Sequence, residues 1–95
     1  MPDRSLEELA AAAVAGDASA LEAVLASVRD DVYGLALRML WHTEDAADAT
    51  QDILIKVMTR LGTYRGEAAL RTWVFGIAAN HLRTVRRSRF ERPRP

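Results

Sequence analysis

The sequence predicts an all-α protein, a compact bundle of about four helices. Apolar residues recur at helical spacing in four separate segments, and no segment shows the apolar–polar alternation that is typical of a strand. Glycines or helix-capping residues separate these segments. Four amphipathic helices with short connections pack around one core, and we expect the two long middle helices to form an antiparallel pair with the fourth across them.

The first two helices have clear start and stop signals. Ser5 and Glu8 form a capping box at the start of the first helix, and Gly16 is expected to end it. Asp17 is expected to cap the second helix, over about residues 18–41. The apolar face of the second helix comprises Leu21, Val24, Leu25, Val28, Val32, Leu35, Ala36, Met39 and Leu40.

The third and fourth helices are predicted in the same way. Thr43 is expected to cap the third helix, Gly62 to end it, and residues 63–69 to form a loop. The apolar face of the third helix comprises Ala46, Ala49, Thr50, Ile53, Leu54, Val57, Met58 and Leu61. That of the fourth comprises Leu70, Trp73, Val74, Ile77, Ala78, His81, Leu82 and Val85. The polar, proline-bearing end of the sequence is expected to be frayed or a linker.

Length and composition limit the classes of protein to consider. The chain has 95 residues, of which 49% are hydrophobic, as expected for one small globular domain. It contains no cysteine, and its start lacks the apolar core of a signal peptide. Since no apolar run approaches the length of a membrane span, we expect a cytoplasmic protein without a membrane partner.

Charge is distributed unevenly along the chain, although the formal net charge is zero. Residues 1–62 carry eleven acidic and five basic side chains, whereas residues 63–95 carry eight arginines and two glutamates. This asymmetry indicates two surfaces with different partners. The arginine-rich part is expected to attract polyanions, because the guanidinium group binds phosphates well.

The outward face of the predicted third helix is acidic. Asp45, Asp48 and Asp52 share this face, with Gln51 beside them and Ile55 at its edge. The pattern is compatible with docking of a basic partner helix. From the residues alone, a solvated face is favoured, because most runs of charge are solvated.

The fourth helix and the loop before it have the pattern of a nucleic-acid surface. Four polar side chains turn away from the apolar face of the helix: Asn80, Arg83, Arg86 and Arg87. Asparagine can hydrogen-bond a base edge, and arginine can hold phosphates. The loop offers a ring, a cation, a hinge and an acceptor for an unstacked base: Tyr64, Arg65, Gly66 and Glu67. Arginines near the C-terminus of a helix also interact favourably with the helix dipole, but the arginines here are more numerous than that interaction requires.

No enzymatic activity, cofactor or metal site is predicted. His42 and His81 lack the spacing of a metal-binding pair, and neither a phosphate-binding glycine loop nor a nucleophile motif occurs. His81 is expected at the edge of the core. Among the aromatic residues, Trp73 is expected in the core, Phe75 at its edge, and Trp41 as a cover over the core at the end of the second helix.

Taken in order, these motifs resemble region 2 of bacterial sigma factors of the extracytoplasmic-function (ECF) type. The matching segments are Gly16-Asp17, the run from Asp45 to Asp52, Tyr64-Arg65-Gly66, and Thr72-Trp73-Val74 followed by Ile77, Ala78, Asn80, Arg86 and Arg87. They cover about residues 5–88. No single motif is decisive, but the ordered set at matching intervals is specific.

The resemblance implies a promoter-specificity subunit of bacterial RNA polymerase that initiates transcription. It implies that the third helix docks on the clamp helices of the β′ subunit, through Asp48, Gln51, Asp52, Ile55 and Met58. It implies that the loop and the fourth helix recognise and melt the −10 promoter element. Tyr64, Arg65, Gly66 and Glu67 would then hold a flipped non-template base, and Asn80, Arg83, Arg86 and Arg87 would contact DNA nearby. An anti-sigma factor is a further implied partner.

The sequence departs from the family pattern in two respects. The family's second domain, which reads the −35 element, is absent from this sequence, so residues 1–88 are expected to form the domain and residues 89–95 to begin a linker. Thr84 stands where many members carry an acid. Two alternatives stay open. One is a module that binds an anti-sigma-type regulator without contacting DNA. The other is a helical domain that binds duplex DNA without polymerase.

Overall fold

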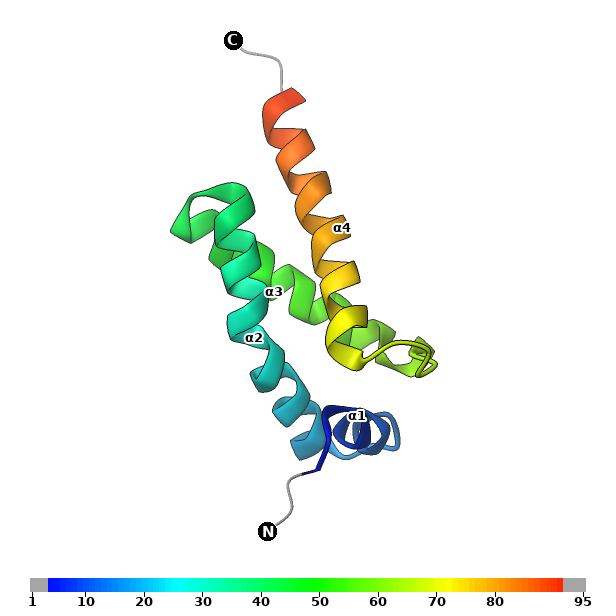
Figure 1. Ribbon diagram of the computed structural model, residues 1–95. Coiled ribbons are helices and arrows are strands. Elements are labelled where there is room, and N and C mark those ends of the chain that lie inside the picture. The colour runs from blue at the N-terminus through cyan, green and yellow to red at the C-terminus, as the bar shows by residue number, and fades with distance from the viewer. Residues whose placement is uncertain (1–3, 92–95) are drawn as a thin grey trace.

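A computed structural model describes residues 4–91 and confirms the all-α bundle. The helices are α1 (Leu6–Val14), α2 (Ala18–Leu40), α3 (Thr43–Arg60) and α4 (Leu70–Glu91), with a 3-10 turn η1 (Leu61–Thr63) after α3. Figure 1 shows α1 at one end of the molecule, against the start of α2 and below the loop that leads into α4. Within the described part of the chain, no helix is both long and apolar enough to cross a membrane.

The core is built from rows of residues spaced mostly four apart on three helices. Residues four apart lie on one face of a helix and form a ridge that packs against its neighbours. The rows are Val24, Val28, Val32 and Ala36 in α2, Ala46, Ala49, Ile53 and Val57 in α3, and Leu70, Val74, Ala78 and Leu82 in α4. All are at most 4% exposed. Because most of these side chains are valine or alanine, the helix axes can approach closely.

Helices α1 and α2 begin at the predicted capping residues. The Ser5 Oγ accepts the N–H of Glu8 at 3.0 Å, and the Glu8 Oε1 accepts the N–H of Ser5 at 2.8 Å. The Asp17 Oδ1 accepts the N–H groups of Ser19 and Ala20 at 3.0 and 3.1 Å. The hydrogen bond from the Ser5 N–H is the main cause that lowers the pKa of Glu8. The hydrogen bond from the Ala20 N–H is the main cause that lowers the pKa of Asp17.

The turn between α2 and α3 differs from the prediction. Helix α2 ends at Leu40, and Trp41 follows in the left-handed conformation, with φ 62° and its N–H donated to the Leu37 carbonyl at 2.8 Å. The Trp41 side chain is 82% exposed, so the expectation that it covers the core is wrong. The left-handed backbone takes Trp41 out of the inward face that Leu40 completes. His42 is the N-cap of α3 instead of Thr43, and it makes no side-chain capping bond.

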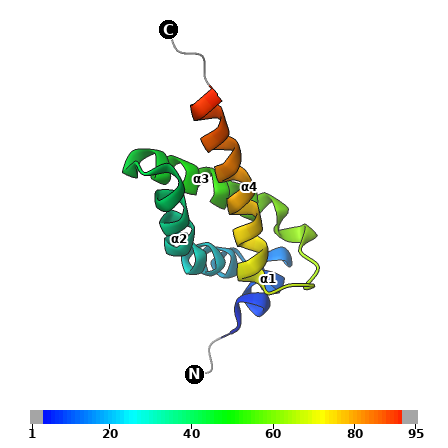
Figure 2. The same ribbon diagram turned by 45° about the horizontal axis from the view of Figure 1, so that its top comes forward.

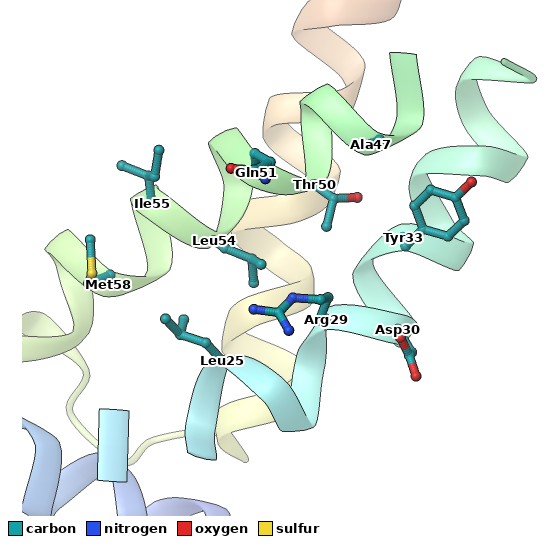
Figure 3. A pocket seen from close by; sticks show the side chains of 10 residues that line it. All are labelled: Leu25, Arg29, Asp30, Tyr33, Ala47, Thr50, Gln51, Leu54, Ile55 and Met58. Atoms are coloured by element: carbon teal, nitrogen blue, oxygen red, sulfur yellow. The ribbon is translucent and has the colours of Figure 1, made fainter. Parts of the chain in front are cut away.

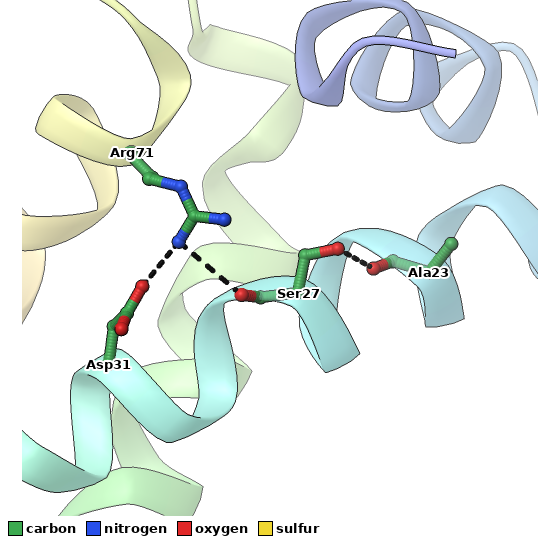
Figure 4. A network of polar contacts seen from close by, with 4 residues as sticks. All are labelled: Ala23, Ser27, Asp31 and Arg71. Carbon is green, nitrogen blue, oxygen red and sulfur yellow. Dashed lines mark hydrogen bonds and ion pairs between the residues drawn. The ribbon is translucent and has the colours of Figure 1, made fainter. Parts of the chain in front are cut away.

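Helix α4 packs across α2 and α3 and is fastened to α2 near its start. Figures 1 and 2 show α3 turning back from the end of α2, antiparallel in direction but inclined to it. The Arg71 Nη1 forms an ion pair with the Asp31 carboxylate and donates to the Ser27 carbonyl at 3.4 Å (Figure 4). The Ser27 hydroxyl in turn donates to the Ala23 carbonyl at 2.8 Å.

A second ion pair fastens the far end of α4. The Arg89 Nη1 lies 2.9 Å from the Asp45 Oδ2 and donates to the Leu40 carbonyl at 3.3 Å, so one guanidinium joins α4 to the end of α2 and the start of α3. Asp45 is half-buried by this contact, although the sequence predicted an outward side chain. Helix α4 continues to Glu91, so residues 88–91 are helical and not frayed. Residues 92–95 lie outside the described residues, and the domain boundary at residue 88 stays a prediction.

The N-terminus of α4 is capped by a distant glutamate. The Glu7 Oε2, on α1, accepts the N–H of Leu70 at 2.8 Å, across 63 residues of sequence. This hydrogen bond is the largest cause of the lowered pKa of Glu7, because it stabilises the charged carboxylate. A carboxylate at this position also interacts favourably with the positive end of the helix dipole. Helix α1 therefore fixes the point at which the loop 64–69 enters α4.

Candidate interfaces on helices α3 and α4

Five residues predicted to contact the polymerase form an exposed area, which we call the α3 surface: Asp48, Gln51, Asp52, Ile55 and Met58. Ile55 is 52% exposed and Met58 is 42% exposed, which is unusual for large apolar side chains. The helical period had placed Met58 inward as well. It lies instead at the open groove between α2 and α3, where it is only partly covered.

A groove of about 440 Å³ between α2 and α3 adjoins the α3 surface (Figure 3). Gln51, Ile55 and Met58 line it, whereas Asp48 and Asp52 do not. The opposite wall belongs to α2 and comprises Leu25, Arg29, Asp30 and Tyr33. In Figure 3, Leu54 points across the groove toward Leu25, while Ile55 points away from α2. Sequence reasoning missed the α2 wall; the four-residue spacing of Leu25, Arg29 and Tyr33 was the available signal.

Asp52 also lies close to α4. Its Oδ2 is 3.8 Å from the Nε2 of His81, which is buried and makes no hydrogen bond. Burial is the largest cause that lowers the pKa of His81, and the positive charge of Lys56 adds to it, whereas Asp52 acts in the opposite direction. The imidazole is therefore held in its neutral form. The predicted position of His81 at the edge of the core is confirmed.

The loop before α4 holds Tyr64 in a fixed position. The Tyr64 hydroxyl donates to the Ala68 carbonyl, which closes the loop on itself. The ring centroids of Tyr64 and Trp73 are 5.5 Å apart and the ring planes are tilted by 55°. Tyr64 is half-buried against the core, as is Trp73, so Trp73 lies at the edge of the core and not in its centre.

A hollow of about 330 Å³ lies between this loop and α1. Tyr64, Arg65 and Gly66 line it from the loop, whereas Glu67 does not. Gly66 has φ 79°, a left-handed conformation that glycine adopts without strain. The other wall is formed mainly by residues of α1: Glu7, Ala10, Ala11 and Val14. The sequence did not indicate this role for α1, because its short apolar face predicted only packing.

The predicted DNA-contacting side chains of α4 are exposed: Asn80, Arg83, Arg86 and Arg87. The Asn80 Oδ1 accepts a hydrogen bond from the Arg83 Nη2, and the Thr84 hydroxyl donates to the Asn80 backbone carbonyl at 3.0 Å. Asn80 therefore offers its amide N–H groups to a partner while its amide oxygen is engaged within the helix. Thr84 makes this local bond at the position where an acid was expected.

The profile of the family described as Sigma-70 region 2 matches residues 24–91, which is most of the chain. The chain belongs to the Sigma-70 region 2 family. The matched segment contains both the α3 surface and the four exposed side chains of α4, whereas α1 lies outside it. The resemblance to ECF sigma factors, stated above from motifs, is confirmed by the relatives.

Three relatives illustrate the range of the similarity. The RNA polymerase sigma-H factor of Pseudomonas aeruginosa is 31% identical over 78 residues, which covers 82% of this chain and 40% of the relative. The ECF RNA polymerase sigma factor SigM of Mycobacterium tuberculosis is 35% identical, with the same coverage. The ECF RNA polymerase sigma-E factor of Haemophilus influenzae is 30% identical over 82% of this chain and 41% of the relative. This region 2 chain thus spans about two fifths of the length of these relatives. No solved structure matches it.

Proposed function

We propose that this Sigma-70 region 2 domain directs bacterial RNA polymerase to promoters, by docking on the polymerase and by holding the opened −10 element. The observation that carries the proposal is that a chain of this family exposes two separate surfaces of different chemistry. One combines carboxylates with apolar side chains on α3, and the other carries an asparagine and arginines on α4. Both tasks are binding and need no covalent step.

The α3 surface is the proposed contact with the clamp helices of the β′ subunit. Asp48 and Asp52 are exposed and can pair with basic side chains of a partner. Ile55 and Met58 supply apolar area that a partner helix would bury, and Gln51 lies between the two kinds of contact. A helix laid along the groove beside them would use a recognition mode in which apolar side chains anchor a helix in a groove.

The loop and α4 are the proposed contact with the non-template strand. Opening duplex DNA costs about 1.4 kcal/mol of stacking per base-pair step, so the opened strand has to be held. Stacking of a base on an aromatic side chain is worth about 1–3 kcal/mol. The hollow beside Tyr64, Arg65 and Gly66 has room for one extruded base, and Glu67 lies at the same loop. Only a promoter whose extruded base fits would then be stabilised in the open form.

The two halves of the proposal are tested by a pair of variants that act as controls for each other. Asp48→Arg is expected to weaken binding to a peptide of the β′ clamp helices by about tenfold, because it places like charges opposite each other. Asn80→Ala is expected to weaken binding of single-stranded −10 DNA by about tenfold, because one base-edge contact is lost. Each variant should leave the other ligand's affinity unchanged.

Two outcomes would contradict the proposal. The docking half fails if Asp48→Arg and a Gln51→Ala variant both bind the clamp peptide as the wild type does. The DNA half fails if duplex and single-stranded −10 DNA bind equally and Asn80→Ala changes neither affinity.

A further inference from the structure

We propose that Trp41, together with His42 and Arg86, forms a second contact for the opened DNA strand, in which the indole stacks on an unpaired base. The proposal rests on the proposed function and extends it to a surface at the turn between α2 and α3. This surface lies beside the C-terminal part of α4, whereas the loop hollow lies at the N-terminal end of that helix (Figure 1). At 1.5 Å per residue, Leu70 and Arg86 are about 24 Å apart along α4.

Trp41 is unfavourable in two ways that packing in the domain does not offset. Its backbone is left-handed, a conformation that glycine or asparagine adopts more easily. The residue is 82% exposed, the largest value among the exposed large hydrophobic residues of the range 4–91. The left-handed conformation ends α2, with the Trp41 N–H bonded to the Leu37 carbonyl, but such a helix end does not call for an indole. A role in binding explains a tryptophan here, whereas a role in folding does not.

The surroundings of Trp41 fit a nucleotide. A hollow of about 270 Å³ is lined by Met39, Leu40, Trp41, His42, Arg86 and Arg89. Arg89 is paired with Asp45, so this carboxylate already has a cationic partner within the protein. His42 and Arg86 are exposed beside the ring. An aromatic face for a base and a guanidinium for the adjoining phosphate are the two parts of a single-strand binding site.

The position of Arg86 favours DNA over a protein as the occupant. Arg86 follows Arg83 by three residues, so the two side chains are neighbours on the surface of α4. A strand held by Asn80 and Arg83 therefore passes next to Arg86, at the edge of the hollow that Trp41 lines. Tryptophan and arginine are also common at protein interfaces, so a protein partner is the competing outcome of the test.

The test uses tryptophan fluorescence of the 95-residue chain. A Trp73→Phe variant leaves Trp41 as the one tryptophan, and a ten-nucleotide single strand carrying a −10 sequence is titrated at low ionic strength. Quenching of Trp41 is expected on binding. The Trp41 variants lack this reporter, so their affinity is measured from the fluorescence anisotropy of a dye-labelled strand. Trp41→Gly is expected to weaken binding by about 5- to 160-fold, as for the loss of one base stack, while Trp41→Phe retains most of the affinity. Glycine suits the left-handed backbone, so the Gly variant is expected to fold, which circular dichroism checks.

Each contrary result identifies what has failed. If Trp41→Gly binds the strand as tightly as the wild type while Asn80→Ala and Arg65→Ala bind it weakly, the inference is wrong and the proposed function stands. If no variant and no wild-type titration shows binding of the strand, the inference and the DNA half of the proposed function are both wrong. If Trp41→Gly loses affinity only for the β′ clamp peptide, Trp41 belongs to a protein interface and the DNA contact is rejected.

Discussion

Trp41 illustrates how one residue can be costly to a fold. A side chain other than glycine in the left-handed region costs of order 1–3 kcal/mol, because its Cβ crowds the backbone. Burial of the ring normally returns more than this, but the Trp41 ring is mostly in solvent. The turn is still formed, because residues on both sides of it, such as Leu40 and Ala46, are buried.

The Trp41→Gly variant is accordingly expected to be more stable than the wild type. Relief of backbone strain outweighs the greater flexibility of glycine in the unfolded chain, so the free energy of unfolding should rise by about 1 kcal/mol. Urea denaturation followed by circular dichroism measures this change. A lower stability would mean that the indole makes stabilising contacts despite its exposure, and would weaken the argument that it is kept for binding.

Asn80 and Arg83 form a pair whose chemistry depends on the partner. With the Asn80 oxygen accepting from Arg83, the free Asn80 amide presents donors alone. Replacement of Arg83 by alanine is expected to free the Asn80 oxygen as an acceptor. Asn80 could then also hydrogen-bond donor groups on a base edge. Base preference at the contacted position, measured with strands that differ at single bases, should then relax. An unchanged preference would mean that Asn80 does not read a base edge.

Between elements, the contact of α3 with α4 makes stability depend on pH. His81 is neutral in the folded protein because its pKa is lowered chiefly by burial, with Lys56 adding to the effect and Asp52 opposing it. A histidine whose folded pKa is lowered binds a proton more readily when the chain is unfolded. Above the ordinary histidine pKa of about 6.5 the side chain is neutral in both states, and its protonation does not lower the free energy of unfolding. As the pH falls from there through the lowered pKa of the folded state, the free energy of unfolding declines.

A His81→Gln variant is expected to lose this decline. Thermal unfolding measured at a series of pH values from about 7.5 to about 5 compares the slopes of the variant and the wild type. His42→Gln is the matched control, because that side chain is exposed at the turn between α2 and α3. Equal slopes in His81→Gln and the wild type would show that another group titrates.

The contact of α1 with α4 adds a second pH dependence, at lower pH. The pKa of Glu7 is lowered mainly by the hydrogen bond from the Leu70 N–H, so the bond stabilises the fold above the ordinary glutamate value of about 4.3. This stability is lost as the pH falls through the lowered pKa. Glu7→Ala is expected to lower the unfolding temperature at neutral pH, and Glu7→Gln to lower it less, because it keeps an acceptor. Equal unfolding temperatures for all three proteins would exclude a capping role.

Over the whole molecule, the sequence predicted what depends on period and local hydrogen bonding. The rows that contain Val24, Ile53 and Leu82 are buried as expected, and Ser5 and Asp17 cap their helices. It failed where the outcome depends on distant segments. No local signal relates Glu7 to Leu70, and periodicity cannot tell that Met58 lies at an open groove and stays 42% exposed.

The charge asymmetry of the whole chain leads to a prediction about salt. If three or four arginines on α4 contact phosphates, log affinity for a single strand should fall with log salt at a slope of roughly −0.7 per contact, or about −2 to −3 in all. Fluorescence titrations at several salt concentrations give this slope. A flat response would favour the alternative in which the domain binds only a protein regulator.

The capping of α4 by Glu7 has a practical consequence for dissecting the domain. A fragment trimmed to the family boundaries, residues 24–91, would keep every side chain proposed to touch polymerase or DNA. It would nevertheless lose the acceptor of the Leu70 amide and one wall of the loop hollow. Such a fragment is expected to bind the β′ clamp peptide normally but to bind −10 DNA weakly. The cause would be that the loop before α4 is unsupported, and not that a contact residue is missing.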